Sequence, residues 1–140
     1  MRLSIRNQLG GTVQSVSRGE VMGIVRVRLD GGQELTSAIT LEAVDELGLV
    51  DGKHVTVLVK STDVAIASDG VGGLSVRNLV PGTVERVDHG AVMTTVKVAI
   101  AGGQSIVSAI TKDGAEDLNL VAGDRVTALV KSTEVSIAVD

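Results

Sequence analysis

The stretch Ser4-Ile5-Arg6-Asn7 returns almost letter for letter as Ser75-Val76-Arg77-Asn78, and this return decides how the chain is organised. In an extended strand, side chains two residues apart point to the same side. The serine and the arginine of each copy are therefore predicted to project together. A hydroxyl beside a guanidinium offers several hydrogen-bond donors and no negative charge. One copy alone is more simply interpreted as an edge strand with a solvated serine and arginine, whereas two copies favour a binding site for an oxyanion.

The repeat extends over nearly the whole chain of 140 residues. Its alignment needs no gap from the pair Leu3 and Leu74 to the pair Ala67 and Ala138, and about half of the aligned positions are identical. Such self-similarity indicates a structural unit that the chain builds twice. The segment between the copies is small, polar and glycine-rich, as flexible linkers are. We therefore expect a first domain over residues 1–68, a linker over residues 69–73 and a second domain over residues 74–140.

Apolar and polar residues alternate along most of each copy, which predicts short β-strands. Asp30-Gly31-Gly32 is a strong hairpin signal. Thr40 is placed to cap a short helix, and Gly48 is placed to end it in the left-handed conformation, for which Asn119 is the next best residue in the second copy. In the first copy we expect strands over residues 3–9, 12–17, 21–29, 33–39, 55–60 and 63–67, with Gly10-Gly11 as a break after the first strand, and a helix over residues 41–47.

Two stretches of the first copy predict how the strands are buried. Val21, Val25, Val27 and Leu29 fall at even spacing, so they are expected to point inward together. The strand over residues 55–60 is almost wholly apolar, so it is expected to be covered on both faces. The predicted fold class is mainly β, with two tandem OB-like β-barrels, each of about five or six strands with one short helix. A β-sandwich is the structural alternative that the sequence leaves open.

The composition excludes several classes of function. The chain has no Phe, Tyr, Trp or Cys, and its formal net charge is -4. Without cysteine, disulfides, thiolate metal sites and thiol catalysis are excluded. An acidic chain without aromatic side chains matches nucleic acid poorly, because it offers neither many phosphate contacts nor a stacking platform. Small domains without aromatic residues gain stability from burying surface against other subunits, so we expect a homo-oligomer. Met22 and Met93 are expected to fill the core rather than to bind a ligand.

The apolar runs of the chain indicate in which cell compartment the protein is expected. The N-terminal segment of residues 1–6 has no long apolar core, so it does not resemble a secretory signal. No apolar run reaches the length that spans a membrane. We therefore expect a cytoplasmic protein without membrane contact. His54 and His89 occupy different positions of the repeat and have no partner at ligand spacing, so a metal-cation site is not expected.

Three motifs occur in the same order in both copies. They are Ser-x-Arg-Asn near the start, Ser-Ala-Ile-Thr before the helix and Leu-Val-Lys-Ser-Thr near the end. With the glycine pattern between them, they resemble the molybdate-binding Mop domain of the molbindins, and the two copies together resemble the di-Mop form. The resemblance covers nearly the whole chain. It implies OB-like barrels, a homotrimer of two-domain chains, and non-catalytic binding of molybdate or tungstate at sites between subunits and at further sites on the threefold axis.

Carried over onto this sequence, the resemblance implies a set of oxyanion-binding residues in each copy. One departure is visible, because Gln8 matches the family whereas the second copy has Leu79, which leaves open whether the two halves bind equally well. The implied oxyanion-binding residues are Ser4, Arg6, Asn7, Thr40, Lys60 and Ser61 in the first copy and Ser75, Arg77, Asn78, Thr111, Lys131 and Ser132 in the second. The candidates for the axial sites are the turn residues Gly19, Glu20, Val21, Gly90, Ala91 and Val92, for which a plain hairpin turn is the competing interpretation.

Elementary electrostatics fits this set of residues. Burying a dianion costs several kcal/mol of hydration, but one arginine and one lysine cancel its formal charge. Hydrogen bonds from charged donors contribute about 1.5–3 kcal/mol each, and the hydroxyls of Thr40 and Ser61 are available for the remaining oxygens. The competing interpretation is that Thr40 and Thr111 only cap helices and that Lys60 and Lys131 only reach solvent.

The sequence therefore predicts a protein that stores or buffers molybdate or tungstate and leaves the anion chemically unchanged. A ligand-sensing regulatory module is the first alternative, although these 140 residues contain no helix-turn-helix segment. A nucleic-acid-binding OB protein is disfavoured by the acidic charge and the missing aromatic residues. An enzyme acting on a phosphorylated metabolite needs a base near the serine and arginine, and none stands out. Residue types do not choose between molybdate and sulfate, because these tetrahedral anions share charge and shape.

Overall fold

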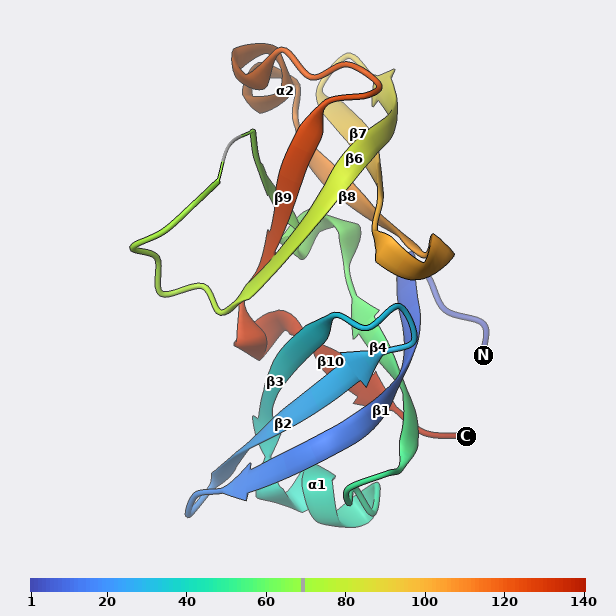
Figure 1. The fold of residues 1–140 in the computed structure, drawn as a ribbon, viewed down its shortest axis with the longest axis vertical. Coiled ribbons are helices and arrows are strands. Elements are labelled where there is room, and N and C mark those ends of the chain that lie inside the picture. The colour runs from blue at the N-terminus through green and yellow to red at the C-terminus, as the bar shows by residue number, and fades with distance from the viewer. Residues whose placement is uncertain (69) are drawn as a thin grey trace.

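Each repeat of the chain contributes five β-strands and one short α-helix. The structure is a computed structural model that describes residues 1–68 and 70–140, and Figure 1 shows its fold. The first repeat contains β1 (Asn7–Arg18), β2 (Met22–Leu29), β3 (Glu34–Thr40), α1 (Leu41–Glu46), β4 (His54–Val59), the 3-10 helix η1 (Ser61–Asp63) and β5 (Ala65–Ala67). The second repeat contains β6 (Asn78–His89), β7 (Met93–Ala99), η2 (Ala101–Gly103), β8 (Ser105–Thr111), α2 (Lys112–Leu118), β9 (Arg125–Val130), η3 (Ser132–Glu134) and β10 (Ser136–Ala138).

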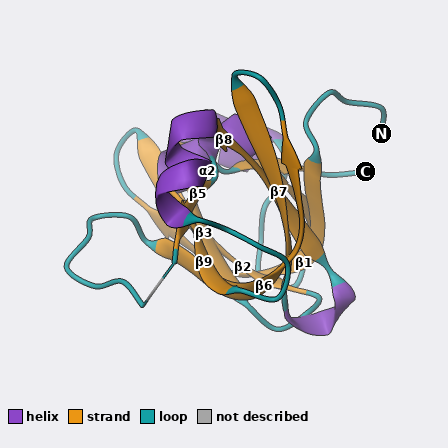
Figure 2. Ribbon diagram, turned by 90° about the horizontal axis from the view of Figure 1, so that it is seen from above, coloured by secondary structure: helices purple, strands orange, loops and turns teal. Residues whose placement is uncertain are grey.

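The strands form two five-stranded sheets, one above the other along the long axis of the molecule, with α1 and α2 at opposite ends (Figure 1). All strand pairs are antiparallel, and the first strand of each repeat lies between its second and fourth strands. Seen from above, the strands curve around the long axis (Figure 2). This arrangement confirms the predicted mainly-β fold of two OB-like units. No helix in the described ranges is long and apolar enough to cross a membrane.

The last strand of each repeat belongs to the sheet of the other repeat. β10 pairs with β4, which places Ile137 opposite Val57, and β5 pairs with β9, which places Ile66 opposite Ala128. In Figure 1 the red strand β10 therefore lies in the lower half, beside the green strand β4. The strand orders are β10-β4-β1-β2-β3 and β5-β9-β6-β7-β8. Each sheet is thus completed by a strand of 3 residues that comes from the other repeat.

Buried polar side chains also join the two halves at equivalent positions. The Asn7 Nδ2 donates to the carbonyl oxygen of Val107 at 2.8 Å, and its Oδ1 accepts from the Val107 N–H at 2.8 Å. Asn78 makes the same two bonds with the backbone of Thr36, at 2.9 and 2.8 Å. Each amide thereby satisfies a backbone donor and acceptor on the outer edge of its sheet, because β3 and β8 are the last strands of the two sheets. Two buried hydroxyls add further bonds, from Ser37 to the carbonyl oxygen of Val135 and from Ser108 to that of Val64.

The core consists largely of valine, leucine and isoleucine side chains. Val25, Val27 and Leu29 are all at most 1% exposed, which confirms their predicted inward positions. Three consecutive residues of β4, Val57 to Val59, are buried, so this strand is covered on both faces as expected. The prediction for Val21 is wrong, because this side chain is 71% exposed. It lies in the bend before β2, outside the residues of the strand itself.

Two predictions about the first strand are also wrong. The predicted break at Gly10-Gly11 does not occur, because β1 runs without interruption from Asn7 to Arg18. A Cβ on Gly11 would lie 2.7 Å from the carbonyl oxygen of Arg28, so glycine at this position permits the close approach of β2. The strand predicted from Leu3 begins only at Asn7, because the chain bends at Ser4 and the residues before Asn7 pair with no strand in the register.

The short helices begin and end as the sequence predicts. The hydroxyl of Thr40 accepts a hydrogen bond from the Ala43 N–H at 3.2 Å, and Thr111 caps α2 in the same way at 3.1 Å. Gly48 has φ 61° and Asn119 has φ 50°, both in the left-handed region. The two repeats therefore specify one backbone path after the helix with different residues.

Candidate oxyanion site

Four of the six residues predicted for each copy lie around one pocket. The pocket of the first repeat has a volume of about 250 Å³ and is lined by Ser4, Ile5, Arg6, Lys60, Ser61 and Thr62. The pocket of the second repeat has a volume of about 240 Å³ and is lined by the equivalent residues Ser75, Val76, Arg77, Lys131, Ser132 and Thr133. We call these the first-repeat site and the second-repeat site.

The pairing of β1 with β4 explains how residues far apart in the sequence share a pocket. Asn7 lies opposite Val59 in the register, so the chain just before Asn7 and the chain just after Val59 meet at one edge of the sheet. The lining of each site combines cationic, hydroxyl and apolar side chains, and no carboxylate is among the described residues that line either pocket. A site of this composition is able to hold an anion by charge and by hydrogen bonds.

The arginine of each site bends its own loop. Arg6 donates from Nε to the carbonyl oxygen of Ser4 at 3.1 Å and from Nη2 to the carbonyl oxygen of Leu3 at 2.6 Å. Arg77 makes the same two contacts with the equivalent carbonyl groups of the second repeat. The prediction that these residues form a strand is wrong, because β1 begins at Asn7 and β6 at Asn78, but the serine and the arginine of each copy line the same pocket. The guanidinium uses part of its fork of five donors to shape the loop that carries the serine.

The first-repeat loop is held by an additional side-chain bond. Gln8 donates from Nε2 to the carbonyl oxygen of Ile5 at 2.9 Å. Leu79 stands at the equivalent position and has no polar group to make this bond, and its side chain is 38% exposed. The replacement of Gln8 by Leu79 between the copies therefore gives the first-repeat loop a side-chain hydrogen bond that the leucine is unable to make in the second-repeat loop.

The serines after β4 and β9 have different surroundings. The Ser132 Oγ lies 2.6 Å from the Oγ1 of Thr36, and either atom is able to be the donor. The Ser61 Oγ is also buried, but it has no hydrogen-bond partner within residues 1–68 and 70–140. η1 packs against β8 as η3 packs against β3, and the repeat places Val107 where the other half has Thr36. A valine side chain offers no polar atom to Ser61.

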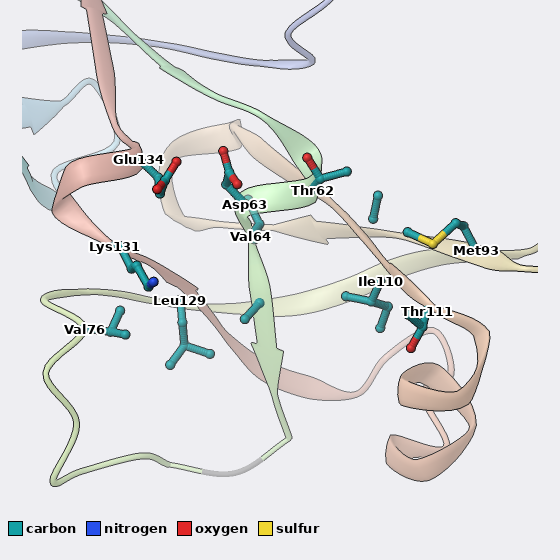
Figure 3. A pocket seen from close by; sticks show the side chains of 12 residues that line it. Thr62, Asp63, Val64, Val76, Met93, Ile110, Thr111, Leu129, Lys131 and Glu134 are labelled. Carbon is teal, nitrogen blue, oxygen red and sulfur yellow. The ribbon is translucent and has the colours of Figure 1, made fainter.

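The structure does not bring the other predicted residues into these two pockets. Asn7 and Asn78 are 2% and 1% exposed, and their amides join the two halves. Thr40 and Thr111 cap the helices, as their place before α1 and α2 predicts. Thr111 lines a different, larger pocket of about 640 Å³, in which it and Lys131 lie at opposite ends (Figure 3). The asparagines precede residues that alternate as a strand, which is the signal that they begin β1 and β6.

The predicted axial residues form tight hairpin turns. The Gly19 N–H donates to the carbonyl oxygen of Met22 at 2.9 Å, and the second repeat makes the equivalent bond. Val21 is 71% exposed and Val92 is 75% exposed, while Met22 and Met93 are 43% and 41% exposed. The prediction that the methionines fill the core is therefore wrong, because both lie at the start of a strand beside an exposed turn. Each repeat thus exposes two neighbouring apolar side chains at this turn.

Comparison with protein families places the chain among known proteins. A family model described as the TOBE domain matches residues 3–66 and residues 74–137. These two matches cover most of the sequence, so the chain belongs to the TOBE-domain family and carries two copies of the domain.

The relatives agree with the predicted resemblance to tandem Mop domains. The molybdenum-pterin-binding protein MopB of Rhodobacter capsulatus is 43% identical over 140 residues, which is 99% of this chain and 52% of the relative. The DNA-binding transcriptional dual regulator ModE of Escherichia coli K12 is 32% identical over 139 residues, with the same coverage. The chain spans about half the length of the curated relatives it matches. A crystal structure of the cytoplasmic molybdate-binding protein ModG with molybdate bound matches all of both chains at 37% identity and a TM-score of 0.96.

Proposed function

We propose that this chain binds molybdate or tungstate reversibly at the first-repeat site and the second-repeat site and serves as a cytoplasmic store or buffer. The observation that carries the proposal is a pocket lined by an arginine, a lysine and two serines, formed twice in one chain. The similarity over the whole chain to a protein described as cytoplasmic and molybdate-binding supports it. The anion is held by charge and hydrogen bonds and leaves unchanged, so the protein is not an enzyme.

The charges of each site match a dianion. Arg6 and Lys60 together supply two positive charges to the first-repeat site, and Arg77 and Lys131 do so in the second. Both lysines are exposed in the single chain and therefore free to turn toward a ligand. The overall formal charge of -4 gives no long-range attraction for an anion, so capture depends on these local groups.

We also propose that the chain assembles as a homotrimer, with the axial turns near its threefold axis. Exposed apolar pairs at the turns of both repeats, Val21 with Met22 and Val92 with Met93, support burial against other subunits. Sedimentation equilibrium is expected to give three times the chain mass of 14.3 kDa. The variant Val21→Asp, Val92→Asp is expected to shift the protein toward single chains, because burying two carboxylates costs several kcal/mol. A wild-type mass of one chain would contradict the trimer.

Calorimetric titration with four tetrahedral anions tests the proposed function. Molybdate and tungstate are expected to bind tightly, whereas sulfate and phosphate bind weakly or not at all. Sulfate is the matched control, because it has the same charge and shape as molybdate but is smaller. Binding of sulfate as tight as that of molybdate would contradict a role in molybdate or tungstate storage.

A ligand-sensing module is the second candidate function. It is favoured by the match of this chain to about half of a relative described as a DNA-binding regulator. A purified chain that acts as a store alone is expected to leave the mobility of a DNA duplex unchanged at physiological salt, with and without molybdate. A shift that depends on molybdate would favour the sensing role.

A further inference from the structure

A residue from the other half of the chain contacts one of the serines that line the second-repeat site. Thr36 lies on β3, and its Oγ1 is 2.6 Å from the Ser132 Oγ and 3.3 Å from the Oδ1 of Asn78. An amide oxygen accepts and never donates. When Thr36 gives its proton to Asn78, the short contact with Ser132 is made by the Ser132 proton. The hydroxyl of Ser132 then has no proton for an anion.

The first-repeat site lacks this competing contact. The residue at the position equivalent to Thr36 is Val107, and the Ser61 Oγ has no partner in the part of the chain that the structure describes. A buried hydroxyl without a partner is unfavourable in the free protein. Serine hydroxyls move between staggered rotamers, so Ser61 gains a bond by turning to an anion and loses none.

We propose that Thr36 makes the two anion sites unequal, so that the second-repeat site binds molybdate more weakly than the first-repeat site. This inference rests on the proposed molybdate-binding function. Ser132 gives up a 2.6 Å contact when it turns to the ligand, whereas Ser61 gives up nothing. The difference of one neutral hydrogen bond corresponds to about a three- to tenfold difference in Kd. Thr36 thus lowers the affinity of the second-repeat site, although it lines neither pocket.

Single-site variants of the full chain measure each site alone. Arg77→Ala leaves the first-repeat site, and Arg6→Ala leaves the second-repeat site. Calorimetric titration with sodium molybdate is expected to give a Kd about three- to tenfold lower for Arg77→Ala than for Arg6→Ala. Gln8 also favours the first-repeat loop, so this comparison by itself does not isolate the contribution of Thr36.

Substitutions at Thr36 and Val107 isolate the contribution of Thr36 to the difference in Kd. Thr36→Val added to Arg6→Ala is expected to lower the Kd about three- to tenfold, because it frees the hydroxyl of Ser132. Added to Arg77→Ala, it is expected to leave the Kd unchanged. Thr36→Ser keeps the hydroxyl and serves as the matched control, with no change expected. Val107→Thr in the Arg77→Ala chain is the reverse test, and it is expected to raise the Kd by a similar factor.

The outcomes separate this inference from the proposed function. Tighter binding with Thr36→Val and weaker binding with Val107→Thr support the inference. Molybdate binding that neither substitution changes overturns the inference and leaves the proposed function standing. A wild-type chain that binds no molybdate overturns both. Circular dichroism of each variant shows whether it is folded. If the Thr36→Val chain does not fold, the Kd of the Val107→Thr chain decides whether the inference holds.

Discussion

Replacing both Arg6 and Arg77 by alanine is expected to remove most of the affinity for molybdate while the fold stays intact. Each guanidinium lies in a lining that also holds a lysine and two serines, and it bends the loop that carries one of these serines. Hydrogen bonds from a charged donor contribute about 1.5–3 kcal/mol, so the Kd is expected to rise about 10- to 100-fold at each site. The fold survives because both side chains are exposed and lie before the first strand of their repeat. Calorimetric titration measures the affinity, and circular dichroism measures the fold.

Two further variants show what the arginines contribute. Arg26→Ala removes the same charge from the exposed face of β2, outside both pockets, and is expected to leave the Kd nearly unchanged. Arg6→Lys with Arg77→Lys keeps the charge but loses the planar fork that contacts two carbonyl groups at once. Affinity is expected to fall at least tenfold in this variant as well. Unchanged affinity in the double alanine variant would refute the site.

A chain cut in its linker is expected to remain one particle. Insertion of a protease site within residues 70–73 allows a single cut between the repeats. The two pieces are expected to elute together from a sizing column and to unfold in one transition, because β10 stays in the sheet with β4 and β5 stays in the sheet with β9. Pieces that separate under native conditions would contradict the strand exchange.

A variant within β10 provides the control for this cut. Ile137 is partly buried and packs against the core opposite Val57. Ile137→Asp places a carboxylate there, which costs several kcal/mol. The cut chain that carries this substitution is expected to fall apart, whereas the uncut chain is held together by its covalent connection. Sizing chromatography before and after cleavage distinguishes the two results.

Much of the fold could be predicted because the sequence states it twice. The caps at Thr40 and Thr111 and the left-handed residues Gly48 and Asn119 obey local rules that hold whatever surrounds them. The burial of Val25 and its neighbours follows from the same alternation that defines the strand. Features that depend on one segment of the chain alone could therefore be predicted from its sequence.

The strand exchange could not be predicted from the sequence. β5 and β10 are 3 residues long, and their alternation is satisfied equally by the edge of either sheet. Which sheet β5 and β10 join depends on the path of the chain after η1 and η3. The alternation of apolar and polar residues does not specify this path. Gly10-Gly11 was misread for a related reason, because a close approach between strands and a turn both call for glycine.

The candidate site was predicted in part. Ser4, Arg6, Lys60 and Ser61 share a pocket because the register of β1 and β4 brings their two segments together, which the motif spacing reflects. Asn7 follows Arg6 directly, yet it turns inward and pairs with a strand of the other half. A motif shows which residues occur together and does not show which of them face a ligand.

The exchange of β5 and β10 has a consequence for how the native protein opens. A sheet that unfolds locally has to release the strand it received, and that strand is continuous with the other repeat. Amide hydrogens on both sides of the molecule, including those of the two short terminal strands, are therefore expected to exchange with solvent through one common rare event. Segments that stand at the end of each repeat, where fraying is usual, are protected as well as the strands at its centre.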